Sequence, residues 1–118
     1  MSLDHILKDA QKLVKNSLGN LIVVFGCGGQ RDKGKRILMG KVAHRLADKI
    51  IITDDNPRNE SPSAIRAEIV AGCPDAIEIG NRDEAIEFAI QQLQGSDSLL
   101  ITGKGHESLQ LIGSETLP

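Results

Sequence analysis

The sequence predicts a single α/β domain over residues 1–118, with a mainly parallel sheet, helices on both faces and one antiparallel edge strand. Two observations lead to this fold class. Short, continuously apolar runs, which are typical of strands buried on both faces, alternate along the chain with segments of helical periodicity. Strands that alternate with helices form parallel sheets through right-handed crossovers, and the helices then cover both faces.

The amino-terminal half is expected to contain two helices and two strands. Apolar residues recur at helical spacing between Leu3 and Val14, and Gly19 follows, which predicts a first helix. The glycine-bounded apolar run Leu21–Phe25 predicts the first strand. The next elements are a helix over residues 34–48 and a strand over residues 49–53.

The carboxyl-terminal half continues the alternation. Ser61 and Asn81 are suitable N-caps for two further helices, and Pro62 suits a first helical position. The connection over residues 103–108 is too short for a crossover helix, so the last strand should be antiparallel. The expected elements are helix 62–72, strand 76–79, helix 82–94, strand 98–102 and edge strand 109–112. Together they form a Rossmann-like arrangement.

The composition excludes several classes of partner. The chain has a net charge of −2, no Trp or Tyr and two Phe, so it has neither a basic surface nor stacking aromatics for nucleic acid. It lacks an apolar run of about 18 residues and a signal-peptide pattern, so we expect no membrane partner. Cys27 and Cys73 do not have the spacing of a zinc-binding pair, and we expect reduced thiols in a cytoplasmic protein.

The loop after the first strand, residues 26–36, combines glycines with four basic side chains and one acidic side chain. Its amides and the start of the next helix would form an anion site, because both present N–H groups to the ligand. The dinucleotide fingerprint is broken by Arg31 at its third glycine, and the phosphate-binding P-loop is broken by Arg36 at its magnesium-binding hydroxyl. The alternative is a flexible turn with a solvated charge run.

The loop after the second strand begins Thr53-Asp54-Asp55-Asn56-Pro57-Arg58. Carboxylates, an amide and a guanidinium together suit a ligand that carries both ammonium and carboxylate groups. An ordinary Asx-Pro turn, with Asp55 paired to Arg58, explains the same residues equally well.

A third polar loop follows the strand 98–102. It contains Gly103-Lys104-Gly105-His106-Glu107, in which glycines permit close backbone approach and His106 and Glu107 offer polar contacts. By itself this could be an ordinary hairpin connection. Ligands of such sheets bind beyond the carboxyl ends of the strands, so we expect the three loops to converge on one site.

Three ordered motifs, from Val24 to Arg36, from Asp55 to Arg58 and from Gly103 to Glu107, together carry a family resemblance. In order and spacing they resemble the carboxyl-terminal domain of the Mur ligases, over nearly the whole chain. In that family the Asp-Asn-Pro-Arg motif is the signature of enzymes that add meso-diaminopimelate rather than lysine. Gln30 departs from the aspartate of the family pattern and removes a negative charge beside Arg31.

The resemblance also implies roles for individual residues. Arg31 and Arg58 would hold the carboxylate ends of meso-diaminopimelate, and Glu107 with the Gly103 carbonyl would hold its distal ammonium. Lys33 and Lys35 would face ATP phosphates. The positions that match the family's diaminopimelate-binding residues are Arg31, Asp55, Asn56, Arg58, Gly103 and Glu107.

For the whole enzyme, the resemblance implies a bacterial, cytoplasmic, ATP-dependent ligase of three domains. ATP and Mg²⁺ would be bound mainly by a central domain and the UDP-N-acetylmuramoyl dipeptide by an amino-terminal one, neither of which is expected within residues 1–118. The enzyme would convert a dipeptide carboxylate to an acyl phosphate, which the diaminopimelate amine attacks. The domain alone would be inactive.

Three other functions compete with this one. A Mur ligase that adds another amino acid or a recycled peptide would share most of these motifs. A stand-alone phosphoacceptor receiver would explain Asp54, Asp55 and Lys104, but it would leave the basic glycine-rich loop without a role. A dinucleotide-binding module is disfavoured by the broken fingerprint.

Overall fold

The computed structural model describes residues 7–8, 12, 19–28, 33–56, 59–101 and 110–113. Five strands form one sheet in the order β3-β2-β1-β4-β5, in which β5 runs antiparallel to β4 and the other neighbours are parallel. The predicted α/β fold with an antiparallel edge strand is confirmed. The strands are β1 (Leu21–Phe25), β2 (Lys49–Ile52), β3 (Ile77–Glu78), β4 (Ser98–Ile101) and β5 (Gln110–Gly113), and the helices are α2 (Lys33–Leu46), α3 (Pro62–Val70) and α4 (Arg82–Gln92).

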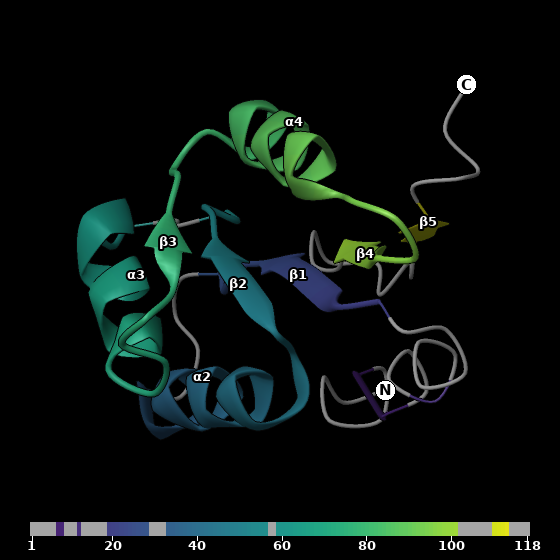
Figure 1. Cartoon of the computed structure of the whole chain (residues 1–118). Helices are drawn as coiled ribbons and strands as arrows, with labels where there is room; N and C mark the ends of the chain where they lie inside the picture. Colours follow the sequence, from purple (N-terminus) through teal and green to yellow (C-terminus); the bar gives the residue numbers. More distant parts are fainter. Residues whose placement is uncertain are drawn as a thin grey trace.

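The central strand β1 divides the core into two layers. Its side chains alternate between the two faces of the sheet, as the period of a strand requires. Val23 and Phe25 pack with residues of α2 and α3, whereas Ile22 and Val24 pack with residues of α4. Figure 1 shows the same division, with α2 and α3 on one face of the sheet and α4 on the other. Both faces of β1 are therefore buried, as its continuous apolar run predicts.

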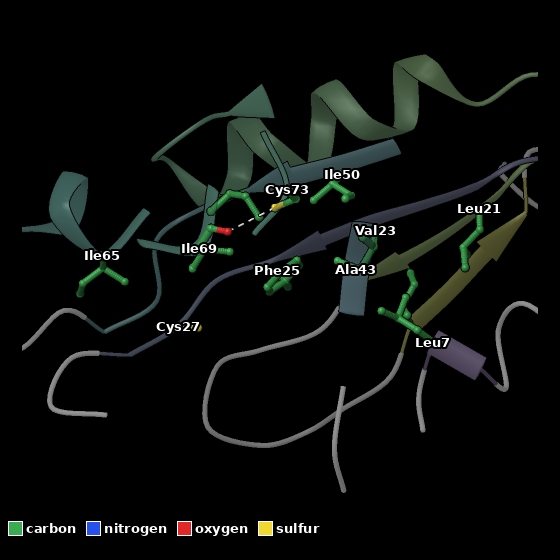
Figure 2. Packing of buried hydrophobic residues seen from close by; sticks show 12 residues of the cluster. Leu7, Leu21, Val23, Phe25, Cys27, Ala43, Ile50, Ile65, Ile69 and Cys73 are labelled. Atoms are coloured by element: carbon green, nitrogen blue, oxygen red, sulfur yellow. Dashed lines mark hydrogen bonds between the residues drawn. The ribbon is translucent and has the colours of Figure 1, made fainter. Parts of the chain in front are cut away.

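Figure 2 shows the larger of these two layers at close range. Leu7 and Leu21 both belong to this cluster, and the Leu7 side chain is fully buried. Ile69 of α3 packs in the same cluster, and its carbonyl oxygen accepts a hydrogen bond from the Cys73 thiol. The amino-terminal segment therefore contributes to the core of the domain through at least one side chain.

Helix α2 approaches α3 and the turn after α3 through two glycines, Gly40 and Gly72. A Cβ atom on Gly40 would lie 2.1 Å from the Ile69 carbonyl oxygen, and one on Gly72 would lie 2.2 Å from the Ile37 carbonyl oxygen. Side chains at either position would push the two backbones apart. The absence of a Cβ therefore permits the close contact that sets the distance between these helices.

Most element boundaries agree closely with the sequence-based predictions. The Ser61 hydroxyl accepts a hydrogen bond from Ala64 N–H, and the Asn81 side chain accepts one from Glu84 N–H, so both predicted N-caps are confirmed. Strand β3 is shorter than predicted and both of its side chains are exposed. Of the predicted helix between Leu3 and Val14, Leu7, Lys8 and Lys12 have helical backbone, and the rest lies outside the described residues.

Candidate functional site

The carboxyl ends of four strands meet at one edge of the sheet. Phe25 of β1 pairs with Ile52 of β2, and Ile52 pairs with Glu78 of β3. On the other side of β1, Val24 pairs with Ile101 of β4. The loops that follow β1 and β2 therefore begin side by side. The third predicted loop, residues 103–108, lies outside the described residues, although the strand before it ends at the same edge.

The first two loops touch through their backbones. A Cβ atom on Gly26 would lie 2.2 Å from the Thr53 carbonyl oxygen, and one on Gly28 would lie 3.3 Å from the Asn56 carbonyl oxygen. Contacts this short between main chains leave no room for a side chain at Gly26. The predicted convergence is thus confirmed for the loops after β1 and β2. The close approach of their backbones explains why the motif has glycine at these positions.

Asp55 and Asn56 are the predicted ligand-binding residues whose surroundings the structure describes in most detail. Asp55 is half-buried and Asn56 is exposed at the edge of the sheet. The Asn56 backbone N–H donates to Asp55 Oδ1 over 2.8 Å. This bond fixes the direction of the Asp55 carboxylate.

Asp54, unlike Asp55, forms an ion pair with a side chain of the neighbouring helix α3. Its carboxylate accepts a short charged hydrogen bond from Arg66 of α3, and the same guanidinium donates to Glu78 of β3 over 3.3 Å. The hydrogen bond to Asp54 raises the pKa of Arg66. The expectation that Asp54 and Asp55 both present acceptors to a ligand is therefore wrong for Asp54, whose carboxylate joins β2 to α3.

Arg36 is the second residue whose predicted environment was wrong. It lies in the first turns of α2 and is 0% exposed, so it contributes neither to a solvated charge run nor to an anion site on the surface. Its guanidinium bonds Glu60 at 2.8 and 3.1 Å and Glu68 of α3 at 2.5 Å. It also donates to the Gly28 carbonyl oxygen over 3.3 Å. The bonds to Glu60 are the largest of the interactions that raise the pKa of Arg36.

Glu60 and Glu68 are the ion-pair partners of Arg36, and the sequence analysis missed both. A signal was available in the sequence of α2, because Arg36 shares one helical face with Gly40 and Ala43, all of which are buried. A charged side chain on the apolar face of a helix needs a charged partner close by. The sequence does not say which partner, because Glu60 and Glu68 lie 24 and 32 residues away.

The remaining predicted site residues are placed only in part. Lys33 opens α2, and Lys35 is exposed in the first turn of that helix, where backbone N–H groups favour a nearby anion. Four of the expected diaminopimelate contacts lie outside the described residues and stay predictions: Arg31, Arg58, Gly103 and Glu107.

The described part of the chain contains neither a metal-binding cluster of side chains nor a helix suited to cross a membrane. Among these residues there is no group of three or more His, Cys, Asp or Glu side chains that could hold a metal ion. None of the described helices combines the length and the apolar character needed to cross a membrane.

Comparisons with known proteins agree on one family. The model of the family "Mur ligase, glutamate ligase domain" matches residues 1–105. The UDP-N-acetylmuramoyl-L-alanyl-D-glutamate--2,6-diaminopimelate ligase of Rhizobium meliloti (strain 1021) is 59% identical over 100 residues, which are 85% of this chain and 21% of the relative. The enzyme of the same name from Rickettsia felis is 59% identical over 109 residues, covering 91% of this chain and 21% of the relative.

A solved structure gives the same result at the level of the fold. It is described as the structure of UDP-N-acetylmuramoyl-L-alanyl-D-glutamate--2,6-diaminopimelate ligase, and it matches with a TM-score of 0.76 and 42% identity. The match covers 88% of this chain and 22% of the solved chain. This chain thus spans about a fifth of the length of the relatives that it matches. The family match, the relatives and the fold together show that the chain belongs to the Mur ligase family and corresponds to its glutamate ligase domain.

Proposed function

We propose that this domain binds meso-diaminopimelate within an ATP-dependent ligase that joins it to a UDP-N-acetylmuramoyl dipeptide. The observation that carries the proposal is the backbone contact of Gly26 and Gly28 with the loop that holds Asp55 and Asn56. This contact brings two of the three family motifs together at one edge of the sheet. The names of relatives at 56–60% identity, all of them 2,6-diaminopimelate ligases, support the choice of amino acid.

The proposed ligand carries two ammonium and two carboxylate groups, and the motif residues offer a partner for each kind. Arg31 and Arg58 would bind the carboxylates, because a guanidinium can hold a carboxylate through two parallel hydrogen bonds. The Gly103 carbonyl and Glu107 would hold the distal ammonium. Asp55 and Asn56 would complete the site from the adjacent loop, where the Asp55 carboxylate is already oriented by a hydrogen bond of 2.8 Å.

The domain would contribute positioning to the reaction. In the proposed sequence of steps, ATP converts the dipeptide carboxylate to an acyl phosphate, and the diaminopimelate amine then attacks the acyl carbon. Holding the amine at the right distance and angle can lower the barrier by several kcal/mol, on the order of 7–11 in favourable cases. Closure of this domain over the rest of the enzyme would complete the site.

We assign ATP and Mg²⁺ mainly to parts of the proposed enzyme other than this domain. Arg36 occupies the position at which a P-loop places its magnesium-binding hydroxyl, and its side chain is buried in ion pairs. Lys33 and Lys35, at the start of α2, would contact ATP phosphates from this side. The proposed enzyme works in the bacterial cytoplasm, and this domain alone should not catalyse the reaction.

The proposal is tested by ligand discrimination. The full-length ligase that contains this domain is titrated with meso-diaminopimelate and, separately, with lysine, which lacks the second carboxylate. We expect meso-diaminopimelate to bind at least about 100-fold more tightly, because one charged pair of hydrogen bonds is lost with lysine. Equal or tighter binding of lysine would refute the choice of amino acid and favour another Mur ligase specificity.

A further inference from the structure

Three segments of the chain are joined by one buried guanidinium. Arg36 donates to Gly28 in the segment after β1, to Glu60 in the loop after β2 and to Glu68 on α3. These partners are 8, 24 and 32 residues away in sequence. The planar guanidinium presents its N–H groups in fixed directions, so the positions of the three acceptors are set relative to one another.

The loop after β2, which we define as residues 53–60, is anchored at both ends. At its start, Asp54 is paired with Arg66 of α3, and the Thr53 hydroxyl donates to the Gly80 carbonyl oxygen over 3.0 Å. At its end, Glu60 is paired with Arg36 over 2.8 Å. Between the anchors lie Asp55 and Asn56, the proposed diaminopimelate contacts. The two ion pairs thus hold the ends of the loop in which Asp55 and Asn56 lie.

The two anchors differ in what they join. The Asp54–Arg66–Glu78 cluster links the 53–60 loop to α3 and β3. Arg36, by contrast, uses one nitrogen atom, Nη2, for both Glu60 and the Gly28 carbonyl oxygen. Because Gly28 also lies against the Asn56 carbonyl, this nitrogen holds together the two loops that form the proposed site.

We propose that Arg36 is a positioning residue for the amino-acid site, which acts through Glu60 and Gly28 to fix the spacing between the segment after β1 and the 53–60 loop. This role rests on the proposed function, since it concerns the ligand that the two loops would hold. Arg36 itself is 0% exposed, so its side chain offers no surface to a ligand. Glu68, which extends from α3 to the same guanidinium, stabilises the fold without determining this spacing.

The experiment compares Glu60→Gln with Glu68→Gln. Substituting Arg36 itself would leave two carboxylates without their partner and could unfold the domain. The two glutamates form a matched pair, because each bonds the same guanidinium and their side chains are 28% and 34% exposed. Each variant removes one negative charge and keeps the size of the side chain. Only Glu60 lies in the 53–60 loop.

The first readout is steady-state kinetics of the full-length ligase. We expect Glu60→Gln to raise the KM for meso-diaminopimelate about tenfold and to change the KM for ATP less than about twofold, since a displaced loop misplaces only the amino acid. Glu68→Gln should change both KM values less than about twofold. Equal effects of the two variants on the KM for meso-diaminopimelate would overturn the proposal, as would an absence of effect from Glu60→Gln.

The second readout keeps this inference separate from the proposed function. Hydrogen exchange of the backbone amides of Cys27, Gly28, Asp55 and Asn56 is followed in the wild type and in both variants without ligand. Glu60→Gln should accelerate exchange at these amides more than Glu68→Gln does. If the wild type fails to use meso-diaminopimelate but this difference is found, the proposed function fails and the loop coupling stands. If exchange is the same in both variants, the proposed coupling of the two loops through Glu60 is refuted, whichever amino acid the enzyme uses.

Discussion

Neighbouring residues of the same type have different roles in this domain. Asp54 and Asp55 follow β2 directly, yet Asp54 pairs with Arg66 whereas Asp55 accepts a hydrogen bond from Asn56 N–H. The difference depends on the position of Arg66 on α3, which becomes close only when the chain folds. Sequence alone could therefore place a pair of carboxylates at the end of the strand, but it could not say which of them pairs with Arg66.

Cys73 gives a residue-scale prediction about alkaline pH. Its thiol is fully buried and donates to the Ile69 carbonyl oxygen, and burial raises its pKa from 9.0 to about 11. The unfolded chain loses this proton at lower pH than the folded chain, so the stability present below pH 9 is lost as the pH rises toward 11. We expect the free energy of unfolding to fall by about 2 kcal/mol from this group over that range.

The measurement is urea unfolding between pH 8 and pH 11, with Cys73→Ala as the control. The chain contains no Tyr, so no phenol titrates in this range. The variant will start from a lower stability because it loses buried sulfur. The quantity to compare is therefore the slope of the free energy of unfolding against pH. Parallel slopes for the wild type and the variant would show that the Cys73 thiol does not contribute to the alkaline loss.

At the scale of elements, local signals predicted most of what the structure contains. Strand β1 has the bounds that its apolar run predicts, and the capping residues Ser61 and Asn81 mark the starts of α3 and α4. Strand β3 is shorter than predicted, because only Ile77 and Glu78 pair with β2. Local patterns thus predict elements well, whereas partners across the fold, such as those of Arg36, require the three-dimensional arrangement.

The contact between α2 and α3 yields an element-scale prediction. Gly40→Ala places a methyl group where the Ile69 carbonyl oxygen lies only 2.1 Å away, so the helices must separate. We expect a loss of about 2–3 kcal/mol in the free energy of unfolding, which is the usual cost of overpacking. Chemical denaturation gives the value directly.

Gly95→Ala is the comparison for that change. Gly95 has a φ of +55° but no atom within 4 Å of an added Cβ, so its substitution strains the backbone without a clash. The expected cost there is about 1 kcal/mol. A Gly40→Ala variant no less stable than Gly95→Ala would contradict the tight contact between α2 and α3.

At the scale of the whole molecule, the two core layers share the central strand. Val23 faces one layer and Val24 the other, so neither layer can lose its packing without affecting β1. The same sharing explains why the fold class was predictable: a strand buried on both faces has a continuous apolar sequence, and this property does not depend on distant partners. The arrangement of the site could not be predicted in the same way, because it depends on how loops from different strands contact each other.

A prediction about cooperativity follows from the shared strand. Ile69→Ala removes packing from the layer below α2 and α3, and Leu99→Ala removes packing from the layer below α4. Each should lower the free energy of unfolding by about 2–5 kcal/mol, and each variant should still unfold in one transition. Calorimetry with circular dichroism tests this, and two separated transitions in either variant would show that the layers unfold independently.

The short strand β3 has a consequence for how copies of the domain behave toward one another. A sheet edge with a long row of unpaired N–H and C=O groups is a template for strand addition and aggregation. Here β3 closes one side of the sheet with only two residues, Ile77 and Glu78. The carboxylate of Glu78, which is bonded to Arg66, adds charge to that border. On this side the sheet offers a neighbouring molecule too little backbone to extend it, so the domain can be held at high concentration without polymerising through β3.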